Sequence, residues 1–129
     1  MDEDLPVGSE EIPDIDQLYH RYHRIFYTAS GLIRGSCFKI KNNIISTNWS
    51  RYSSPEETRN QAKTPSDNGV IEMNVGAVRN IEFLGVLHTP KLENHAHTDI
   101  FGFENYSSRA DLNEVRIFLA NISRWIIKF

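Results

Sequence analysis

The chain has 129 residues, of which 40% are hydrophobic and 24% are charged, and its formal net charge at pH 7 is −3. These values are ordinary for one globular domain and exclude a collagen-like, low-complexity or wholly disordered chain. The acidic balance also argues against a protein that coats nucleic acid nonspecifically, because such proteins carry an excess of lysine and arginine.

The first 14 residues are rich in acids and contain two prolines and one glycine. Such a segment has too little apolar surface to offset the entropy lost on ordering, so we expect a flexible acidic tail at residues 1–14. The acids also stand where a secretory signal would need a basic start and an apolar run. We therefore expect a cytoplasmic protein, with residues 15–129 forming one domain.

Residues 15–26 have two interpretations. Their apolar side chains recur at helical spacing, and Asp14 can cap such a helix. The same stretch is rich in tyrosine, isoleucine and phenylalanine, which favour strands. Helix and strand both remain open here. The apolar positions are Ile15, Leu18, Tyr19, Tyr22, Ile25 and Phe26.

Residues 37–40 and 44–49 are predicted to form a hairpin that turns at Asn42 and Asn43. Cys37 is the single cysteine, so the chain can form no intramolecular disulfide, which is typical of a reducing compartment.

The sequence Ser54-Pro55-Glu56-Glu57 has the residues of a capping box and predicts a short helix. The turn-forming residues 64–69 end that helix. Three further stretches, residues 70–75, 81–87 and 95–103, have strand-like patterns. Their connections are too short for parallel crossovers, so we expect an antiparallel sheet of four to five strands.

The last predicted element is an amphipathic C-terminal helix that begins near Ser108 and continues to Phe129. Its apolar seam would pack on one face of the sheet, which makes the fold class α+β. Trp125 and Phe129 widen the apolar surface, so this helix is a candidate contact for a protein partner or a second copy. No stretch approaches the roughly 18 apolar residues of a membrane span, so no membrane partner is expected. The seam consists of Leu112, Val115, Leu119, Ile122, Ile126 and Phe129.

A candidate metal site lies at His95, His97 and Asp99. On a strand these side chains point to one face, and two imidazoles with one carboxylate are ordinary ligands of a divalent metal. The spacing is similar to the His-x-His-x-Asp-His motif of metallo-β-lactamase-like hydrolases. Ile100 stands where that family has its third histidine, and the chain is much shorter than that fold.

A metal-free alternative makes His97 a general acid or base. Asp99 or Asp67 would orient the imidazole, and an arginine would hold a phosphate. The candidate arginines are Arg21, Arg24, Arg34 and Arg51, of which we select Arg21 as the catalytic one and Arg34 as a binding residue.

Residues 19–24, Tyr-His-Arg-Tyr-His-Arg, alternate rings that stack on bases with cations that bind phosphate. Tyr19 and His20 are therefore candidate binding residues for a nucleotide or RNA. Together with Ser46-Thr47 on a strand, this stretch resembles ADP-ribosyltransferase-type folds, in which an early histidine or arginine and a Ser-Thr strand frame NAD. The late Glu-x-Glu of that family is absent from this chain.

Residues 38–102 also resemble a group of small bacterial proteins of unassigned function. The shared positions are Ser46, Asn68-Gly69-Val70, Val75-Gly76, Pro90, Asn94, Ala96-His97 and Gly102. This resemblance implies a bacterial origin and selects His97 over His95, but it implies no activity.

Two functions follow as hypotheses. The first is a small cytoplasmic bacterial binding or accessory module of a multi-component system, acting through protein contacts. The alternative is an enzyme that acts on a nucleotide, NAD or RNA, in the manner of an ADP-ribosyltransferase or a nuclease, with His97 as acid or base. The alternative requires His97 in a concave pocket beside an arginine, whereas the first hypothesis requires an exposed apolar patch elsewhere.

Overall fold

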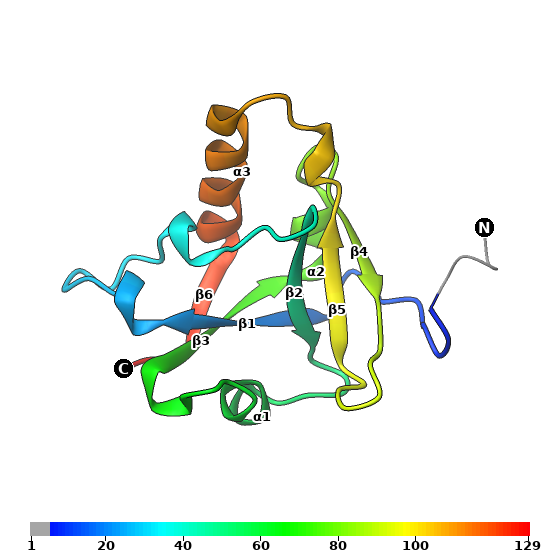
Figure 1. Ribbon diagram of the computed structural model, residues 1–129, viewed down its shortest axis with the longest axis horizontal. Helices are drawn as coiled ribbons and strands as arrows, with labels where there is room; N and C mark the ends of the chain where they lie inside the picture. The colour runs from blue at the N-terminus through cyan, green and yellow to red at the C-terminus, as the bar shows by residue number, and fades with distance from the viewer. Residues whose placement is uncertain (1–5) are drawn as a thin grey trace.

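Residues 6–129, the part of the chain that the computed structural model describes, fold into one six-stranded antiparallel sheet with three α-helices (Figure 1). The α+β class and the antiparallel sheet are confirmed, and the sheet has at least one strand more than predicted. The strand order is β4-β5-β2-β1-β3-β6. The strands are β1 Gln17–His23, β2 Ile44–Trp49, β3 Asn68–Asn74, β4 Gly85–His88, β5 His97–Phe101 and β6 Ser123–Ile127. The helices are α1 Pro55–Asn60, α2 Val75–Arg79 and α3 Arg109–Ile122.

The sheet is divided into two halves that meet at a narrow junction. Strand β1 pairs with β3 over seven residues but with β2 over only two, Leu18 with Trp49 and Tyr19 with Asn48. Beyond that junction β1 and β2 diverge, and in Figure 1 strands β2 and β5 cross the direction of β1. One half therefore contains β1, β3 and β6, and the other contains β2, β5 and β4.

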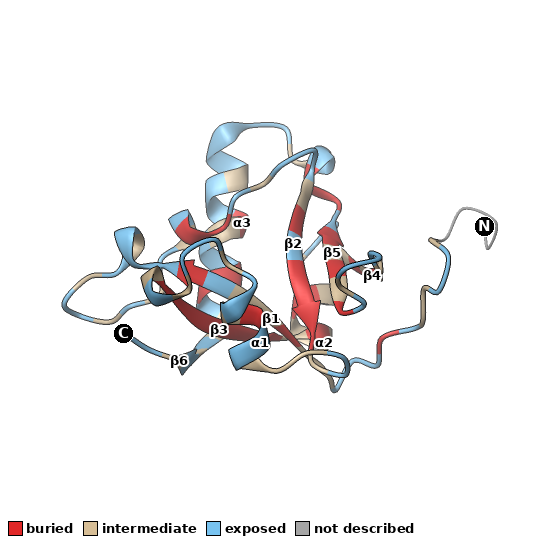
Figure 2. Cartoon of the chain, turned by 60° about the horizontal axis from the view of Figure 1, so that its bottom comes forward, coloured by how far each residue is buried: buried red, intermediate tan, exposed pale blue. Residues whose placement is uncertain are grey.

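The hydrophobic core lies on the face of the sheet that α3 covers. It includes Leu18 and Tyr22 from β1, Trp49 from β2, and Val115 and Leu119 from α3, all of them at most 1% exposed. Figure 2 shows the buried residues concentrated on the strands, whereas most of α3 is exposed. None of the helices within residues 6–129 is both long and apolar enough to cross a membrane.

Residues 17–23 form a strand, so the helical interpretation of this region is wrong and the strand alternative is confirmed. The side chains of Leu18 and Tyr22 point into the core, while Arg21 and His23 are exposed. A helix would satisfy its hydrogen bonds locally, but here β2 and β3 supply partners on both sides. Strand propensity and tertiary pairing together determine the outcome.

The C-terminal helix is shorter than predicted, because α3 ends at Ile122 and residues 123–127 form β6. Strand β6 pairs with β3, with Trp125 opposite Ile71. The last residues are β-branched and aromatic, and β3 would otherwise present unpaired backbone groups at the sheet edge. The predicted apolar seam therefore does not continue to Phe129.

Two smaller differences concern the segments beside β2 and β3. Residues 37–40 are not a strand, and the expected hairpin reduces to a bridge between Lys41 and Ile44. Asn42 and Asn43 have positive φ at this turn, which asparagine tolerates. Helix α2 was not predicted. It begins after Asn74, whose side chain accepts a hydrogen bond from the Ala77 amide and caps it.

The acidic N-terminal segment packs on the domain from Ser9 onward, where the sequence predicted a flexible tail. Ile12 is 4% exposed, and Arg79 Nη1 donates to its carbonyl oxygen at 2.7 Å. Ser9 Oγ donates to the carbonyl oxygen of His88 at 2.7 Å. One apolar side chain and these polar contacts hold an otherwise hydrophilic segment against the domain. Residues 1–5 of the predicted tail lie outside the described part of the chain.

Helix α1 has the predicted capping box. Ser54 Oγ accepts from the Glu57 amide at 3.1 Å, and Glu57 Oε1 accepts from the Ser54 amide at 3.0 Å. We expect Ser54→Ala to lower the free energy of unfolding by about 1 kcal/mol, measured by urea denaturation, because a cap bond is lost. Ser54→Asp retains a capping oxygen and should remain close to wild type. Equal stability of the alanine variant and wild type would contradict the assigned role.

Candidate functional site

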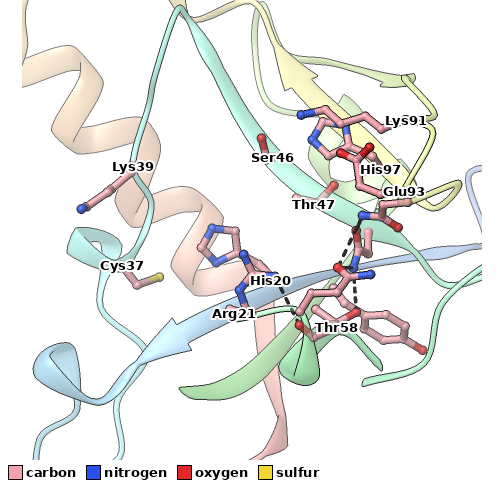
Figure 3. A pocket seen from close by; sticks show the side chains of 14 residues that line it. His20, Arg21, Cys37, Lys39, Ser46, Thr47, Thr58, Lys91, Glu93 and His97 are labelled. Carbon is pink, nitrogen blue, oxygen red and sulfur yellow. Dashed lines mark hydrogen bonds between the residues drawn. The ribbon is translucent and has the colours of Figure 1, made fainter. Parts of the chain in front are cut away.

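A cavity of about 570 Å³ lies at the junction where β1 and β2 diverge (Figure 3). We call it the junction pocket. Strands β1, β2 and β5, helix α1, residues 37–39 and the loop before β5 all contribute to its walls. Its lining consists of Tyr19, His20, Arg21, Cys37, Lys39, Ser46, Thr47, Asn48, Thr58, Gln61, Lys91, Glu93, Asn94 and His97.

The strand register brings three polar side chains into one row across the sheet. Tyr19 on β1 is opposite Asn48 on β2, and Asn48 is opposite His97 on β5. Directly opposite residues of antiparallel strands share one face of the sheet. A second row has Ser46 opposite Asp99. The strand register therefore makes this face of the sheet polar at the pocket, while the hydrophobic core lies on the opposite face of the sheet.

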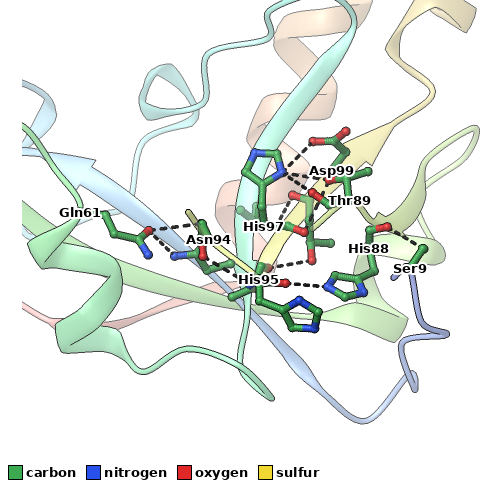
Figure 4. Close-up of polar contacts among 12 residues, drawn as sticks. Ser9, Gln61, His88, Thr89, Asn94, His95, His97 and Asp99 are labelled. Atoms are coloured by element: carbon green, nitrogen blue, oxygen red, sulfur yellow. Dashed lines mark hydrogen bonds and ion pairs between the residues drawn. The ribbon is translucent and has the colours of Figure 1, made fainter. Parts of the chain in front are cut away.

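An amide network joins three elements beside this row (Figure 4). Asn48 Nδ2 donates to Thr58 Oγ1 at 3.0 Å and to Gln61 Oε1 at 2.8 Å. Asn94 Nδ2 donates to Asn48 Oδ1 at 2.8 Å, and Asn94 Oδ1 accepts from the Ala96 amide at 3.2 Å. Because the amide nitrogen and the amide oxygen of Asn94 both form hydrogen bonds, the loop that leads into His97 is fixed to β2 and α1.

His97 has one ring nitrogen anchored and the other available. Its Nδ1 lies 2.9 Å from Thr89 Oγ1 and 3.2 Å from the Thr89 carbonyl oxygen. The Thr89 hydroxyl can donate or accept, whereas the carbonyl oxygen only accepts; in the tautomer with its proton on Nδ1, the neutral ring presents a lone pair on Nε2. Burial, and then the charge of Lys91, lower the pKa of His97. These causes favour a neutral imidazole that can accept a proton.

Asp99 lies behind His97 on the same face of β5. Its Oδ1 is 3.8 Å from His97 Nδ1 and is buried without a hydrogen-bond partner in the described chain. Burial raises the pKa of Asp99, while the neighbouring His97 opposes that rise. The carboxylate favours a protonated His97, so it would stabilise an imidazolium formed during a reaction.

The pocket is basic although the chain is acidic. Arg21, Lys39 and Lys91 line it, and within the described part of the chain Glu93 is the one acid among its lining residues. Arg21 Nη1 donates to the Thr58 carbonyl oxygen at 3.2 Å, so its guanidinium is held beside α1. A net charge of −3 over the whole chain makes this local excess of positive charge a specific feature. Such a site attracts anionic ligands.

His20 and Tyr19 approach the pocket from opposite faces of β1. His20 Nδ1 is buried without a hydrogen-bond partner among residues 6–129, and its ring lies 4.9 Å from the Phe38 ring. Burial, reinforced by the charge of Arg21, lowers the pKa of His20 from 6.5 to about 4. Burial and then the charge of Glu72 raise the pKa of Tyr19. Tyr19 therefore offers an aromatic ring to a ligand in the pocket, whereas the His20 nitrogen is buried beside it.

The three residues of the predicted metal site do not converge. His95 precedes β5, and its Nε2 lies 3.6 Å from Glu10 Oε2, away from the pair formed by His97 and Asp99. Its ring also contacts Tyr52, with ring centroids 4.4 Å apart. Within residues 6–129, no group of three histidine, cysteine or acidic side chains could hold a metal ion. The i, i+2, i+4 spacing fails because the strand begins only at His97.

The other predicted residues lie outside the pocket. Trp125 packs on Tyr22 with ring centroids 4.6 Å apart, and its Nε1 donates to the Gly31 carbonyl oxygen at 2.7 Å. Phe129 contacts Tyr27, with centroids 5.0 Å apart. Both side chains therefore make contacts within the chain. Arg34 lies on a second cavity.

Asp67 does not orient His97, because it pairs with Arg24 at 3.5 Å. Sequence reasoning also missed several pocket residues, chiefly Asn48, Gln61 and the two lysines. Asn94 was noted through the resemblance to bacterial proteins, but its bonds to Asn48 depend on a strand register that local patterns do not reveal.

No known protein family, no curated protein and no solved structure matches the chain. The functional assignment therefore depends on the residues and geometry of the junction pocket.

Proposed function

We propose that the junction pocket binds a nucleotide and that His97 acts on the bound ligand as a general acid or base. The observation that carries this proposal is that Tyr19, Arg21 and His97 line one cavity in which cations outnumber acids. An aromatic ring, phosphate-binding cations and a titratable imidazole are the groups that a nucleotide site needs. A cytoplasmic bacterial setting, in which nucleotides are abundant, belongs to the same proposal.

The resemblance to ADP-ribosyltransferase-type folds supports a dinucleotide such as NAD among the possible ligands. The two stretches that carry it, residues 19–21 on β1 and Ser46-Thr47 on β2, line the same pocket. The Glu-x-Glu of that family is absent, and β5 instead provides His97 and Asp99. We therefore assign the proton transfer to His97 and the support of its charged form to Asp99.

Calorimetric titration with adenosine, ADP and NAD tests the binding step. We expect ADP and NAD to bind and Lys91→Glu to weaken both at least about tenfold, because a hydrogen bond from a cation to phosphate is worth about 1.5–3 kcal/mol. Adenosine lacks phosphate, so its binding should change little. Lys128→Glu makes the same charge change at an exposed residue outside the pocket lining and serves as the matched control.

The variant His97→Gln separates nucleotide binding from the catalytic step. This variant should retain ADP binding and abolish any turnover of NAD, followed by mass spectrometry of the products. Wild-type protein that gives no saturable heat with ADP or NAD would overturn the nucleotide proposal. Binding without turnover would remove the catalytic role of His97 and leave a nucleotide-binding module.

Exposed apolar side chains on α3 support the protein-contact hypothesis. Ile117 and Phe118 on α3 are 54% and 47% exposed. A module that acts through this helix should form a dimer or a complex that Ile117→Asp disrupts, measured by light scattering after size-exclusion chromatography. A monomer that binds nucleotide would favour the pocket as the functional site.

A further inference from the structure

A second cavity, of about 860 Å³, lies between residues 32–41 and helix α3. We call it the α3 groove. Four cations line it, Arg34, Lys39, Lys41 and Arg116, and no aspartate or glutamate among residues 6–129 does. Lys39 also lines the junction pocket, so the two cavities share a wall.

We propose that the junction pocket and the α3 groove form one binding track for a single-stranded nucleic acid. The inference rests on the proposed function, because one nucleotide would occupy the junction pocket. The backbone of the strand would then pass Lys39 and continue along Arg34 and Lys41. The ligand of the whole track is thus a polynucleotide, of which the nucleotide in the junction pocket is one unit.

The distribution of charge supports a polyanion. The chain has 17 acidic residues against 14 lysines and arginines, yet the described residues that line the two cavities include six of those cations and one acid, Glu93. A single phosphate group needs only one or two of these cations. Cations spread along two adjoining cavities match the repeated phosphates of a strand.

The wall between the two cavities is held in place before any ligand binds. Arg116 Nε donates to the Phe38 carbonyl oxygen at 3.0 Å, and its Nη1 donates to Asn113 Oδ1 at 3.1 Å. Gly35 approaches α3 so closely that a Cβ there would lie 3.0 Å from the Arg116 backbone. Residues 35–38 are therefore fixed against α3, which keeps Arg34 and Lys39 at the two ends of one short segment.

The groove also offers apolar surface to bases. Leu32 and Ile117 are 69% and 54% exposed at its edge. Exposed apolar side chains between cations suit a strand whose bases are unstacked, whereas a duplex keeps its bases inside. This combination favours a single strand over a duplex.

Fluorescence anisotropy with labelled hexa-adenylate, as RNA and as DNA, tests the inference, with AMP titrated by calorimetry as the reference. We expect the hexamers to bind wild-type protein at least tenfold more tightly than AMP. The double variant Arg34→Glu/Lys41→Glu should lose that gain and retain AMP binding. The slope of log affinity against log salt concentration should also be shallower for this variant by about 1.4, because two phosphate contacts are lost and each contributes about 0.7 in a single strand.

The matched control is Arg109→Glu/Lys128→Glu, which makes the same charge change at two exposed residues outside both cavity linings. Retained hexamer affinity in this control, with loss in the groove variant, supports the track. Equal loss of hexamer affinity in both variants overturns the track, because the loss then comes from the change in net charge of the protein. A poly-glutamate hexamer that competes as well as the oligonucleotides also overturns it.

The inference and the proposed function fail in different ways. If AMP binds and the hexamers bind no more tightly, the track is wrong and the nucleotide pocket stands. If neither AMP nor the hexamers bind, both proposals are wrong. RNA that binds more tightly than DNA would identify the natural strand, and equal binding would leave the track intact without a preference for sugar.

Discussion

Replacing Trp49 by alanine should lower the free energy of unfolding by about 3–5 kcal/mol, the largest loss that we expect from one substitution. Trp49 is fully buried, and its ring lies 5.0 Å from the His88 ring and 5.3 Å from the Tyr52 ring. Its Nε1 donates to Asp16 Oδ2 at 2.9 Å. The truncation would leave a large cavity at the junction of the two half-sheets and remove this hydrogen bond.

Trp49 also matters for the pocket, because its backbone forms one of only two pairs between β1 and β2. Trp49→Phe retains most of the buried ring and loses the bond to Asp16, so we expect a cost of about 1–2 kcal/mol. Urea denaturation of the three proteins measures both values. A cost below about 2 kcal/mol for the alanine variant would contradict the view that this side chain joins the half-sheets.

The elements that the sequence predicted well are those whose signals are local. Helix α1 has a complete capping box, and its sequence specifies both the start and the partner of each bond. Strands β2 and β3 lie between turn-forming residues and were predicted almost to their ends. In each case a few adjacent residues contain the whole signal, so no knowledge of the rest of the fold is required.

The elements that were misread or left open depend on neighbours distant in the sequence. Residues 123–127 extend the apolar spacing of α3, but they form β6 because the edge of β3 is available to pair with them. Residues 17–23 form β1 because β2 and β3 flank them on both sides. Periodicity alone does not separate helix from strand in such short apolar stretches.

In the candidate site, too, single residues could be predicted from local sequence, whereas their arrangement depends on distant neighbours. His97 was selected from the sequence, and Arg21 and Tyr19 were selected as chemistry-bearing residues of one stretch. Their meeting in one pocket follows from the register that pairs Tyr19, Asn48 and His97 across three strands. A shift of one residue in any pair would turn these side chains to the core face, so no pattern within one strand could have predicted the pocket.

Lowering the pH from 6.5 to 4 should destabilise the protein through His20. Burial lowers the pKa of this imidazole to about 4 in the folded protein, from 6.5. Between these values the unfolded chain binds a proton that folded His20 does not, so stability falls by about 1.4 kcal/mol per pH unit, roughly 3 kcal/mol in all. Well above pH 6.5 the ring is neutral in both states and contributes no pH dependence.

His20→Gln and His20→Phe both remove the titrating group, one with a polar and one with an apolar side chain. Between pH 6.5 and 4, the free energy of unfolding of each variant should therefore fall by roughly 3 kcal/mol less than that of wild type. Urea denaturation at a series of pH values measures this difference.

NMR titration of the His20 ring measures its pKa directly. A phosphate bound in the junction pocket would favour the charged imidazole, so saturating ADP should raise this pKa. A pKa near 6.5 without ligand would contradict the burial argument, and a pKa that ADP leaves unchanged would separate His20 from the nucleotide site.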